Sequence, residues 1–359
     1  MLGLDHSYIN TSVPSMNGEN YYILMTHVDH CFSTLILRSY TSTRISVTKA
    51  LFRMNSTKIQ LINSIQLTLT EAVQYEMRKA LILILMLMAL NMFGQKNPTE
   101  EALPIVAEGK LLYQSEMASW YGTDLFLDNF KDRDKIGGYF SYSEGDSTKC
   151  VFFSNDDWPK VLGTISFDSS YHVENANTNL TKRDFTAAEN DLYQIRRVAL
   201  TQLQSNEDEF FVFYQNTSPN IIPLISGDVR KVYVLTGPQQ SGVVIFGNDY
   251  LLTFDENNKL LDKRPLHKNI IPMEYGDVEK GMEVEGAMHS HLPETGDFIT
   301  PTDICTLMLY AKFANLKTYN VVSEKYLNTW NCETETLTVI PMEVIRKINE
   351  HGNEGKKNR

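Results

Sequence analysis

The sequence of 359 residues has little cysteine and no C-x-x-C pair. Its four cysteines, Cys31, Cys150, Cys305 and Cys332, stand far apart in the chain, so a zinc site made of thiolates is not expected. A cluster of basic residues is also lacking, and the formal net charge is −11. Nucleic acid is therefore not an expected partner.

A hydrophobic run long enough for a comfortable membrane span is lacking as well, since such a span needs about 20 apolar residues. The apolar run Ala80–Leu90 is shorter, and it follows the basic pair Arg78-Lys79. A basic segment, an apolar segment and a polar exit are typical of a secretory signal peptide, here residues 77–95. A buried apolar helix and a signal anchor are the rival interpretations. We expect an exported protein, periplasmic or secreted, without a stable membrane span after cleavage.

The residues before this segment fit poorly with it, because a signal peptide works at the N-terminus of a chain. Residues 1–76 are rich in Ser, Thr and Asn and show no sustained helical or strand period. We therefore expect translation to begin at Met77, and residues 1–76 to be a mis-assigned or disordered extension. The exported part would keep an odd number of cysteines, with a Cys305–Cys332 disulfide as one option.

Two domains are predicted after the signal peptide. Residues 96–185 read as a linker over 96–110 followed by a small α+β domain of unknown role, with a helix over 110–130 and strands separated by turn-forming residues. The second domain, residues 186–348, begins with a helix over 186–203, and residues 349–359 are expected to be a disordered tail. The strands predicted in the second domain are 209–214, 229–236, 242–246, 250–254, 260–264, 284–291, 317–323, 328–332 and 336–340.

The strongest chemical signal is the pair His289 and His291, which lie one residue apart in the predicted strand 284–291. The period of two along a strand points both imidazoles to the same face. Asp303 follows, in the first turn of a helix that begins with Thr300 as the N-cap and Pro301 at the first helical position. Two histidines and one carboxylate, with an open fourth position, are the ligand pattern of a catalytic zinc.

This arrangement resembles the JAMM (MPN/JAB) zinc metalloprotease family over residues 186–342. The family signature is a Glu, then His-x-His, then seven residues, then Ser-x-x-Asp. Here His289-Ser-His291 is followed by eight residues and by Thr300-x-x-Asp303, with Leu292 where the family mostly has Pro. The resemblance implies an α+β fold, a mixed or antiparallel sheet flanked by helices of JAMM/cytidine-deaminase-like type, beside the smaller N-terminal α+β domain.

The resemblance also implies roles for individual residues. His289, His291 and Asp303 would bind Zn²⁺, and the metal would lower the pKa of a water in the fourth position. Glu209, at the start of the strand after the helix 186–203, would be the general base. Thr300, in place of the family Ser, would steady the oxyanion. Glu209 lies far before His289 in the chain, which implies an inserted hairpin around 251–265.

Several alternatives stay open from the residues alone. Thr300 and Asp303 are equally consistent with a plain capping pair, and Glu294 or Asp297 are alternative third ligands. Glu285 is four residues from His289, about 13 Å along a strand, which is too far to reach the same metal. Three single histidines are interpreted as structural or surface residues: His172, His267 and His351.

The expected function is an exported zinc hydrolase of JAMM type that cleaves a peptide or isopeptide-like amide bond. The alternative is a catalytically inactive JAMM-like module of the cell envelope that binds a protein or peptide. A structural envelope protein whose histidines bind nothing is the third hypothesis.

Overall fold

A computed structural model of the protein describes residues 73–82, 97–275 and 286–357. The chain divides into two compact units, Met1–Gln95 and Lys96–Arg359. In the first unit residues 73–82 form a helix, and the rest of the predicted extension and signal peptide lies outside the described residues. Within the described ranges, no helix is both long and apolar enough to cross a membrane.

The second unit is α+β, and its first long helix confirms the helix predicted over 110–130 but begins earlier in the chain. Helices α3 (Pro98–Glu101) and α4 (Leu103–Asn129) occupy the region 96–110, so the predicted linker is wrong. Asn97 caps α3 by accepting a hydrogen bond from the backbone of Thr99. The inner side of α4 is lined largely by small residues, including Gly109, Ser115 and Ala118. Such a face lacks the bulky periodic residues by which a buried helix is normally recognised.

An antiparallel sheet packs against one end of α4. It has the order β1-β2-β3-β4, and its first three strands confirm the short strands predicted for this region. The strands are β1 (Ile136–Glu144), β2 (Ser147–Ser154), β3 (Val161–Phe167) and β4 (Asn177–Asn179), with 3-10 turns at Arg133–Lys135 and Val173–Asn175. The aromatic rings of Phe126 on α4 and Phe152 on β2 are stacked with centroids 3.9 Å apart, which ties helix to sheet.

Helix α5 (Ala187–Ser205) precedes a second antiparallel sheet in the chain. Thr186 and Glu189 form a capping box, and Glu189 also receives two hydrogen bonds from Arg183. The sheet has the order β5-β6-β8-β9. Its strands are β5 (Thr217–Ser226), β6 (Val229–Pro238), β8 (Tyr250–Phe254) and β9 (Leu260–Pro265).

The strand predicted over 209–214 is wrong, because this segment is an irregular connection between α5 and β5. Asn206 ends α5 in the left-handed conformation, and its side chain amide accepts from the backbone N–H of Phe211 and donates to the carbonyl of Phe211. Glu209 has a positive φ of 52°. The backbone groups of Phe211 are therefore satisfied by a side chain and need no neighbouring strand.

The last part of the unit contains two further sheets and the helices α6 and α7. Strands β7 (Val243–Gly247) and β10 (Ile270–Glu274) pair with each other, and β11, β12, β13 and β14 form a four-stranded sheet in that order. Strands β11 and β12 are parallel, because α6 connects them as a crossover. The elements are β11 (Gly286–Ser290), α6 (Pro301–Tyr310), β12 (Thr318–Val322), β13 (Tyr326–Asn331), β14 (Thr336–Pro341) and α7 (Met342–Lys357), the last running through most of the segment predicted as a tail.

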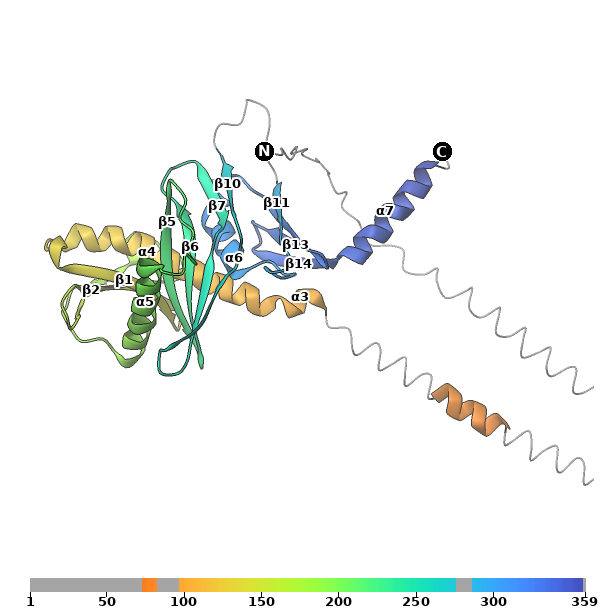
Figure 1. The fold of residues 1–359 in the computed structure, drawn as a ribbon, viewed down its shortest axis with the longest axis horizontal. Coiled ribbons are helices and arrows are strands. Elements are labelled where there is room, and N and C mark those ends of the chain that lie inside the picture. The colour runs from red at the N-terminus through yellow and green to blue at the C-terminus, as the bar shows by residue number, and fades with distance from the viewer. Residues whose placement is uncertain (1–72, 83–96, 276–285, 358–359) are drawn as a thin grey trace, which may run out of the picture. The chain divides into compact units, whose positions relative to one another are not determined.

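Helix α6 lies at the centre of the unit, with α4 crossing it (Figure 1). One side of α6, including Ile304 and Leu307, packs in the core with β7 and the sheet β11–β14. Another side of α6, formed by Cys305 and Leu309, packs with Leu112 of α4 and with the sheet β5-β6-β8-β9. Gly109 makes the helix crossing close: a Cβ there would lie 2.7 Å from Cβ of Ile304. The N-terminus of α6 is thus held from both sides.

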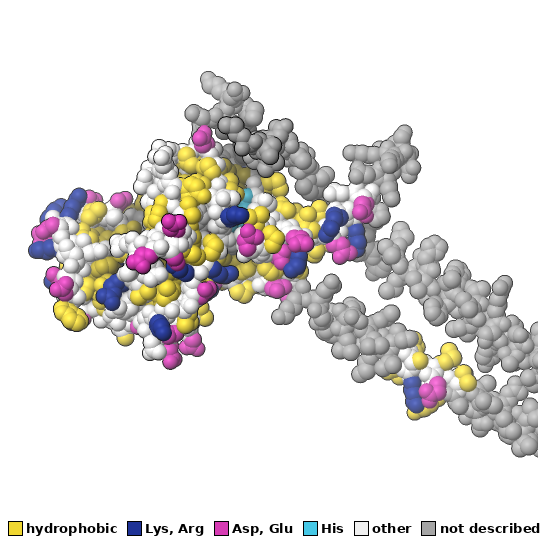
Figure 2. Space-filling model, viewed as in Figure 1, with side chains coloured by type: hydrophobic (Ala, Val, Ile, Leu, Met, Phe, Trp, Pro, Cys, Tyr) yellow, Lys and Arg dark blue, Asp and Glu magenta, His cyan; other side chains and the backbone are white. Residues whose placement is uncertain are grey.

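The boundary predicted between residues 185 and 186 lies inside this second unit, where α4 packs both on the sheet β1–β3 and on α6. On the face drawn in Figure 2, acidic and basic side chains are interspersed with hydrophobic ones.

Candidate metal centre

Strand β11 carries His289 near its C-terminal end, and His291 directly follows the strand. The strand alternates in exposure: Met288 and Ser290 are exposed, while His289 and His291 are both only 8% exposed. The backbone is held in register by β12, and the N–H of His291 donates to the carbonyl of Val322 over 2.8 Å. Both imidazoles therefore point into the protein, as the period of two predicted.

Asp303 enters the same space from the N-terminus of α6. It forms a capping box with Thr300: the backbone N–H of Asp303 donates to Thr300 Oγ1, and the backbone N–H of Thr300 donates to Asp303 Oδ2 over 3.0 Å. The Thr300 hydroxyl also donates to Oδ2 over 2.7 Å. Oδ2 thus has two hydrogen-bond donors, whereas the buried atom Oδ1 has none.

His267 is a fourth member of the group, and of its predicted roles, structural or surface, the surface position is wrong. It lies in the irregular connection between β9 and β10 and is 8% exposed. The connection is anchored by Leu266, a buried residue whose N–H donates to the carbonyl of Asp249 over 2.7 Å. No spacing in the sequence relates His267 to the His-x-His pair, because long-range contacts, the pairing of β7 with β10 and the hydrogen bond from Leu266 to Asp249, place this connection.

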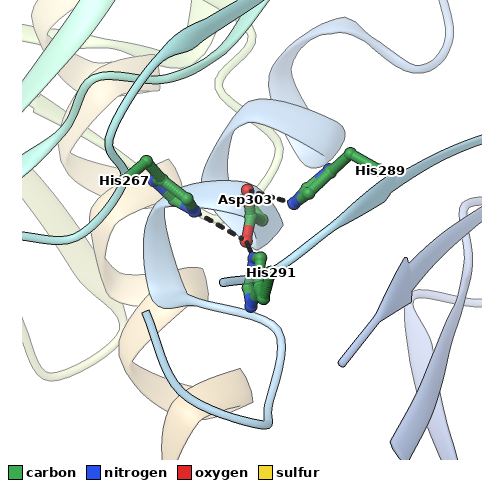
Figure 3. Close-up of side chains that lie close together, drawn as sticks. All are labelled: His267, His289, His291 and Asp303. Atoms are coloured by element: carbon green, nitrogen blue, oxygen red, sulfur yellow. Dashed lines mark ion pairs between the residues drawn. The ribbon is translucent and has the colours of Figure 1, made fainter. Parts of the chain in front are cut away.

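The four side chains converge on one point (Figure 3). Each offers a nitrogen or oxygen, and these four atoms lie within 4.8 Å of one another. Asp303 Oδ2 is 3.3 Å from Nε2 of His291 and 3.5 Å from Nε2 of His267, and Oδ1 is 3.7 Å from Nε2 of His289. Donor atoms about 2 Å from a common ion in a tetrahedral arrangement are roughly 3.3 Å apart, so the group needs little adjustment to hold one.

Unsatisfied buried atoms are the second sign of a metal centre. Nε2 of His267, Nε2 of His289, Nε2 of His291 and Oδ1 of Asp303 are all buried and lack a hydrogen-bond partner. Buried polar atoms are nearly always hydrogen-bonded, and leaving one unsatisfied costs about 1–3 kcal/mol. Each of the four residues thus directs at least one such atom at the others, and a shared cation explains this arrangement. The group is therefore able to bind a metal ion, whose identity its geometry leaves open.

The histidines and carboxylates of the site shift one another's pKa values. Burial disfavours the charged form of His267, but the carboxylates of Asp303 and Asp249 outweigh it and raise the pKa of His267 to about 10. Burial lowers the pKa of His289 to about 4, with Asp303 opposing and His291 and His267 reinforcing the shift. Burial also acts to raise the pKa of Asp303, but His267 and His289 hold it well below its usual value. The site therefore holds one buried carboxylate that requires positive charge beside it.

The remaining predicted site residues lie in different places. Thr300 is beside the group, with its hydroxyl engaged in the capping box of α6. Glu209 is exposed in the connection between α5 and β5 and does not belong to the group of four. Asp297 pairs with Lys325 over 2.8 Å, and Glu294 is exposed. Glu285 lies outside the described residues.

The described cysteines are also separate from the group. Cys150 and Cys305 are buried and Cys332 is half-buried, and all three are free thiols, so Cys305 and Cys332 do not form a disulfide. Burial raises the pKa of Cys305 well above its usual value, which keeps it a neutral core residue although it is only two positions from Asp303.

No protein-family model, no curated protein and no solved structure matches this chain. The class that the described residues define is thus an α+β protein with a buried group of three histidines and one aspartate that can bind a metal ion.

Proposed function

We propose that the protein binds one zinc ion through His267, His289, His291 and Asp303, and that the ion holds three segments of the fold together. The observation that carries this proposal is the convergence of four possible metal-ligand atoms, one from each residue, that are buried and have no hydrogen-bond partner. Three imidazole nitrogens and one carboxylate oxygen suit zinc, which accepts nitrogen and oxygen ligands in tetrahedral geometry. The same donors also accept Fe²⁺ or Mn²⁺, but at a given site the affinity for zinc is higher.

The number of protein ligands favours a closed site over a catalytic one. Structural zinc sites are closed by four protein ligands, whereas catalytic sites keep one position for water or substrate. Here His267 supplies the fourth ligand. The three segments joined would be the connection after β9, the end of β11 and the start of α6. This corresponds to a non-catalytic JAMM-like module whose partner is a protein or peptide.

A hydrolase of JAMM type is the second candidate, and one observation favours it. His289 lies on strand β11, His291 directly follows that strand with its N–H paired to Val322, and Asp303 is on a capped helix. His267, in contrast, lies on an irregular connection. If His267 leaves the fourth position free, a bound zinc would supply a Lewis acid for cleavage of a peptide or isopeptide-like amide. The crossover from β11 through α6 to β12 supports the likeness to the JAMM/cytidine-deaminase-like fold.

In that second candidate the chain's own residues would work as follows. The capping box would orient the Asp303 carboxylate, and burial would exclude bulk water from the histidines. Thr300 would act through Asp303, because its hydroxyl already donates to Oδ2. Glu209 would not be the base from its exposed position, so the proton acceptor would be another group.

One experiment separates the two candidates. The zinc in the purified protein is replaced by Co²⁺, and the visible spectrum is recorded with and without azide or thiocyanate. A closed site predicts a four-coordinate spectrum that these anions do not change. An anion-dependent spectrum, together with cleavage of a peptide library that a chelator abolishes, would instead establish the hydrolase. A chain that binds neither metal would reject both.

We also propose that the protein is exported, with residues 77–95 as its signal peptide. Its basic, apolar and polar order fits a secretory signal. N-terminal sequencing of the protein recovered from its native cells tests this directly. A mature N-terminus near residue 96 is expected, and an intact N-terminal peptide from residues 1–76 would contradict it.

A further inference from the structure

Each imidazole of the metal centre has two nitrogens, and only one of them can face the ion. A histidine that binds a metal through Nε2 must carry its proton on Nδ1, and a hydrogen-bond acceptor at Nδ1 fixes that tautomer and the orientation of the ring. Two residues outside the group of four lie at these Nδ1 positions: Tyr319 and Asp249.

Tyr319 on β12 contacts His289. Its hydroxyl oxygen is 3.0 Å from Nδ1 of His289, and the tyrosine is only 2% exposed. The ring is held by Phe246 of β7, with stacked centroids 4.6 Å apart at 24°. Burial also raises the pKa of this hydroxyl far above its usual value, so the group stays neutral. Tyr319 thus holds a fixed hydroxyl oxygen at hydrogen-bond distance from Nδ1 of His289, where it can accept a hydrogen bond from that nitrogen.

Asp249 occupies the equivalent place beside His267. Its Oδ2 is 3.5 Å from Nδ1 of His267, and the residue is 4% exposed. A shift of about 0.6 Å would bring this pair to an ordinary hydrogen-bond length. The other carboxylate oxygen, Oδ1, accepts from the backbone N–H of Thr236 over 3.0 Å. The carboxylate is therefore fixed by the strand β6 and cannot turn freely.

The network behind Asp249 makes this support rigid. Thr236 Oγ1 donates to the carbonyl of Asn248 over 2.7 Å, and the Asn248 amide donates to Thr236 Oγ1 and to the carbonyl of Val212. Asn248 has a positive φ of 55°, which turns the chain between β7 and β8. That turn brings Asp249 next to the connection that carries His267, since Leu266 donates to the Asp249 carbonyl.

His291 differs from the other two histidines. Its Nδ1 is buried and has no hydrogen-bond partner among the described residues, and its orientation comes from the strand backbone instead. The three histidines therefore form a graded internal comparison: His289 has a hydrogen bond at Nδ1, His267 has a carboxylate oxygen 3.5 Å from Nδ1 that is not yet a hydrogen bond, and His291 has neither among the described residues.

We propose that Tyr319 and Asp249 are positioning residues of the metal centre, which hold His289 and His267 as Nδ1–H tautomers with Nε2 directed at the ion. This inference rests on the proposed metal binding. Partners of this kind typically change metal affinity 10–100-fold when they are removed.

The test uses the full chain loaded with zinc, with Tyr319→Phe and Asp249→Asn as variants. Tyr233→Phe is the control for the first, since Tyr233 is equally buried and loses a hydroxyl bond to Glu108 away from the site. Asp191→Asn is the control for the second, since it loses an ion pair with Arg230. Zinc affinity is measured by competition with a chromophoric chelator, and histidine tautomers by ¹⁵N–¹H correlation spectra.

Affinity about 10–100-fold weaker in both variants, with the controls near wild type, is the expected result. The spectra should show Nδ1–H and metal-bound Nε2 for His267 and His289, and Tyr319→Phe should alter the signals of His289 but leave those of His267. Unchanged affinity in both variants, or binding through Nδ1, would overturn the inference and leave the metal centre intact. A wild-type chain that binds no zinc would instead reject the proposed function itself.

Discussion

Nε2 of His267 lies 3.5 Å from Oδ2 of Asp303, although the two residues belong to segments far apart in the chain. This relationship turns a three-ligand motif into a four-ligand group. It favours the proposed closed site over the proposed hydrolase, because a fourth protein ligand would occupy the position that a catalytic zinc keeps for water or substrate.

The first prediction concerns that fourth ligand. We expect His267→Ala to weaken zinc binding while one ion per chain is still bound, since His289, His291 and Asp303 remain. The Co²⁺ spectrum of this variant should become sensitive to azide, because a coordination position is open. His172→Ala is the control, since His172 is exposed and its imidazole lies 3.5 Å from Glu174, outside the group of four. An anion-insensitive spectrum in His267→Ala would show that His267 is not a ligand.

The second prediction concerns Thr300, whose hydroxyl links helix stability to the site. Thr300→Ala should lower the free energy of unfolding by about 1 kcal/mol through loss of the N-cap. It should also weaken zinc binding, because Asp303 Oδ2 loses a 2.7 Å hydrogen bond. Thr300→Ser should keep both the stability and the zinc affinity near wild type, because serine retains the hydroxyl.

A matched control for Thr300 exists on α5, where Thr186 forms the same kind of capping box with Glu189. Thr186→Ala should cost a similar free energy of unfolding but leave zinc affinity unchanged. Chemical denaturation and chelator competition measure the two quantities. Equal loss of affinity in both alanine variants would show that the effect is general destabilisation.

The third prediction concerns Glu209, which the family resemblance assigned as general base. Because Glu209 is exposed and outside the group, Glu209→Gln should leave zinc content, zinc affinity and any peptidase activity unchanged. A large loss of hydrolytic activity with normal zinc content would restore Glu209 to the role that the motif suggested.

The fourth prediction concerns Glu116, a partly buried carboxyl on α4. Burial raises its pKa to about 7, while a hydrogen bond from the Asn220 amide opposes the shift. A folded-state pKa above the unfolded value means that the stability contribution is complete below about pH 4.5 and is lost as the pH rises through about 7. The loss is on the order of 2 kcal/mol, after a discount for partial exposure to solvent.

Replacement of this carboxyl should remove that pH dependence. Denaturant unfolding of wild type and Glu116→Gln at pH 5 and pH 8 measures it, with the exposed residue Glu256→Gln as control. We expect the wild type to lose stability relative to Glu116→Gln on going from pH 5 to pH 8. Parallel pH profiles for the two proteins would contradict this account.

Local signals in the sequence were sufficient for much of the fold. The cap Thr300-Pro301 and the apolar spacing of residues 186–203 predicted the starts of α6 and α5, and short segments bounded by turn-forming residues predicted most of the described strands. The helix over 98–129 was only partly predicted, because its buried face uses small residues such as Gly109 that carry little periodic signal. The segment 209–214 was misread, because Asn206 satisfies the backbone there in place of a strand partner.

The candidate site divides in the same way. His289, His291 and Asp303 were predictable because a strand and a capped helix are close in sequence and set their directions locally. His267 was not, because its place depends on the pairing of β7 with β10 and on the contact between Leu266 and Asp249. Tyr319 and Asp249 are invisible to motif analysis for the same reason. Long-range packing, and no local pattern, brings them to the histidines.

The most direct test of the account is metal content per chain. The purified full chain is analysed by inductively coupled plasma mass spectrometry for all first-row transition metals, beside His289→Ala, Asp303→Asn and the control His172→Ala. We expect about one zinc per chain in the wild type and in the control, and a large loss of zinc content in His289→Ala and Asp303→Asn. Equal metal content in all four proteins, or none in the wild type after zinc is supplied, would contradict the account.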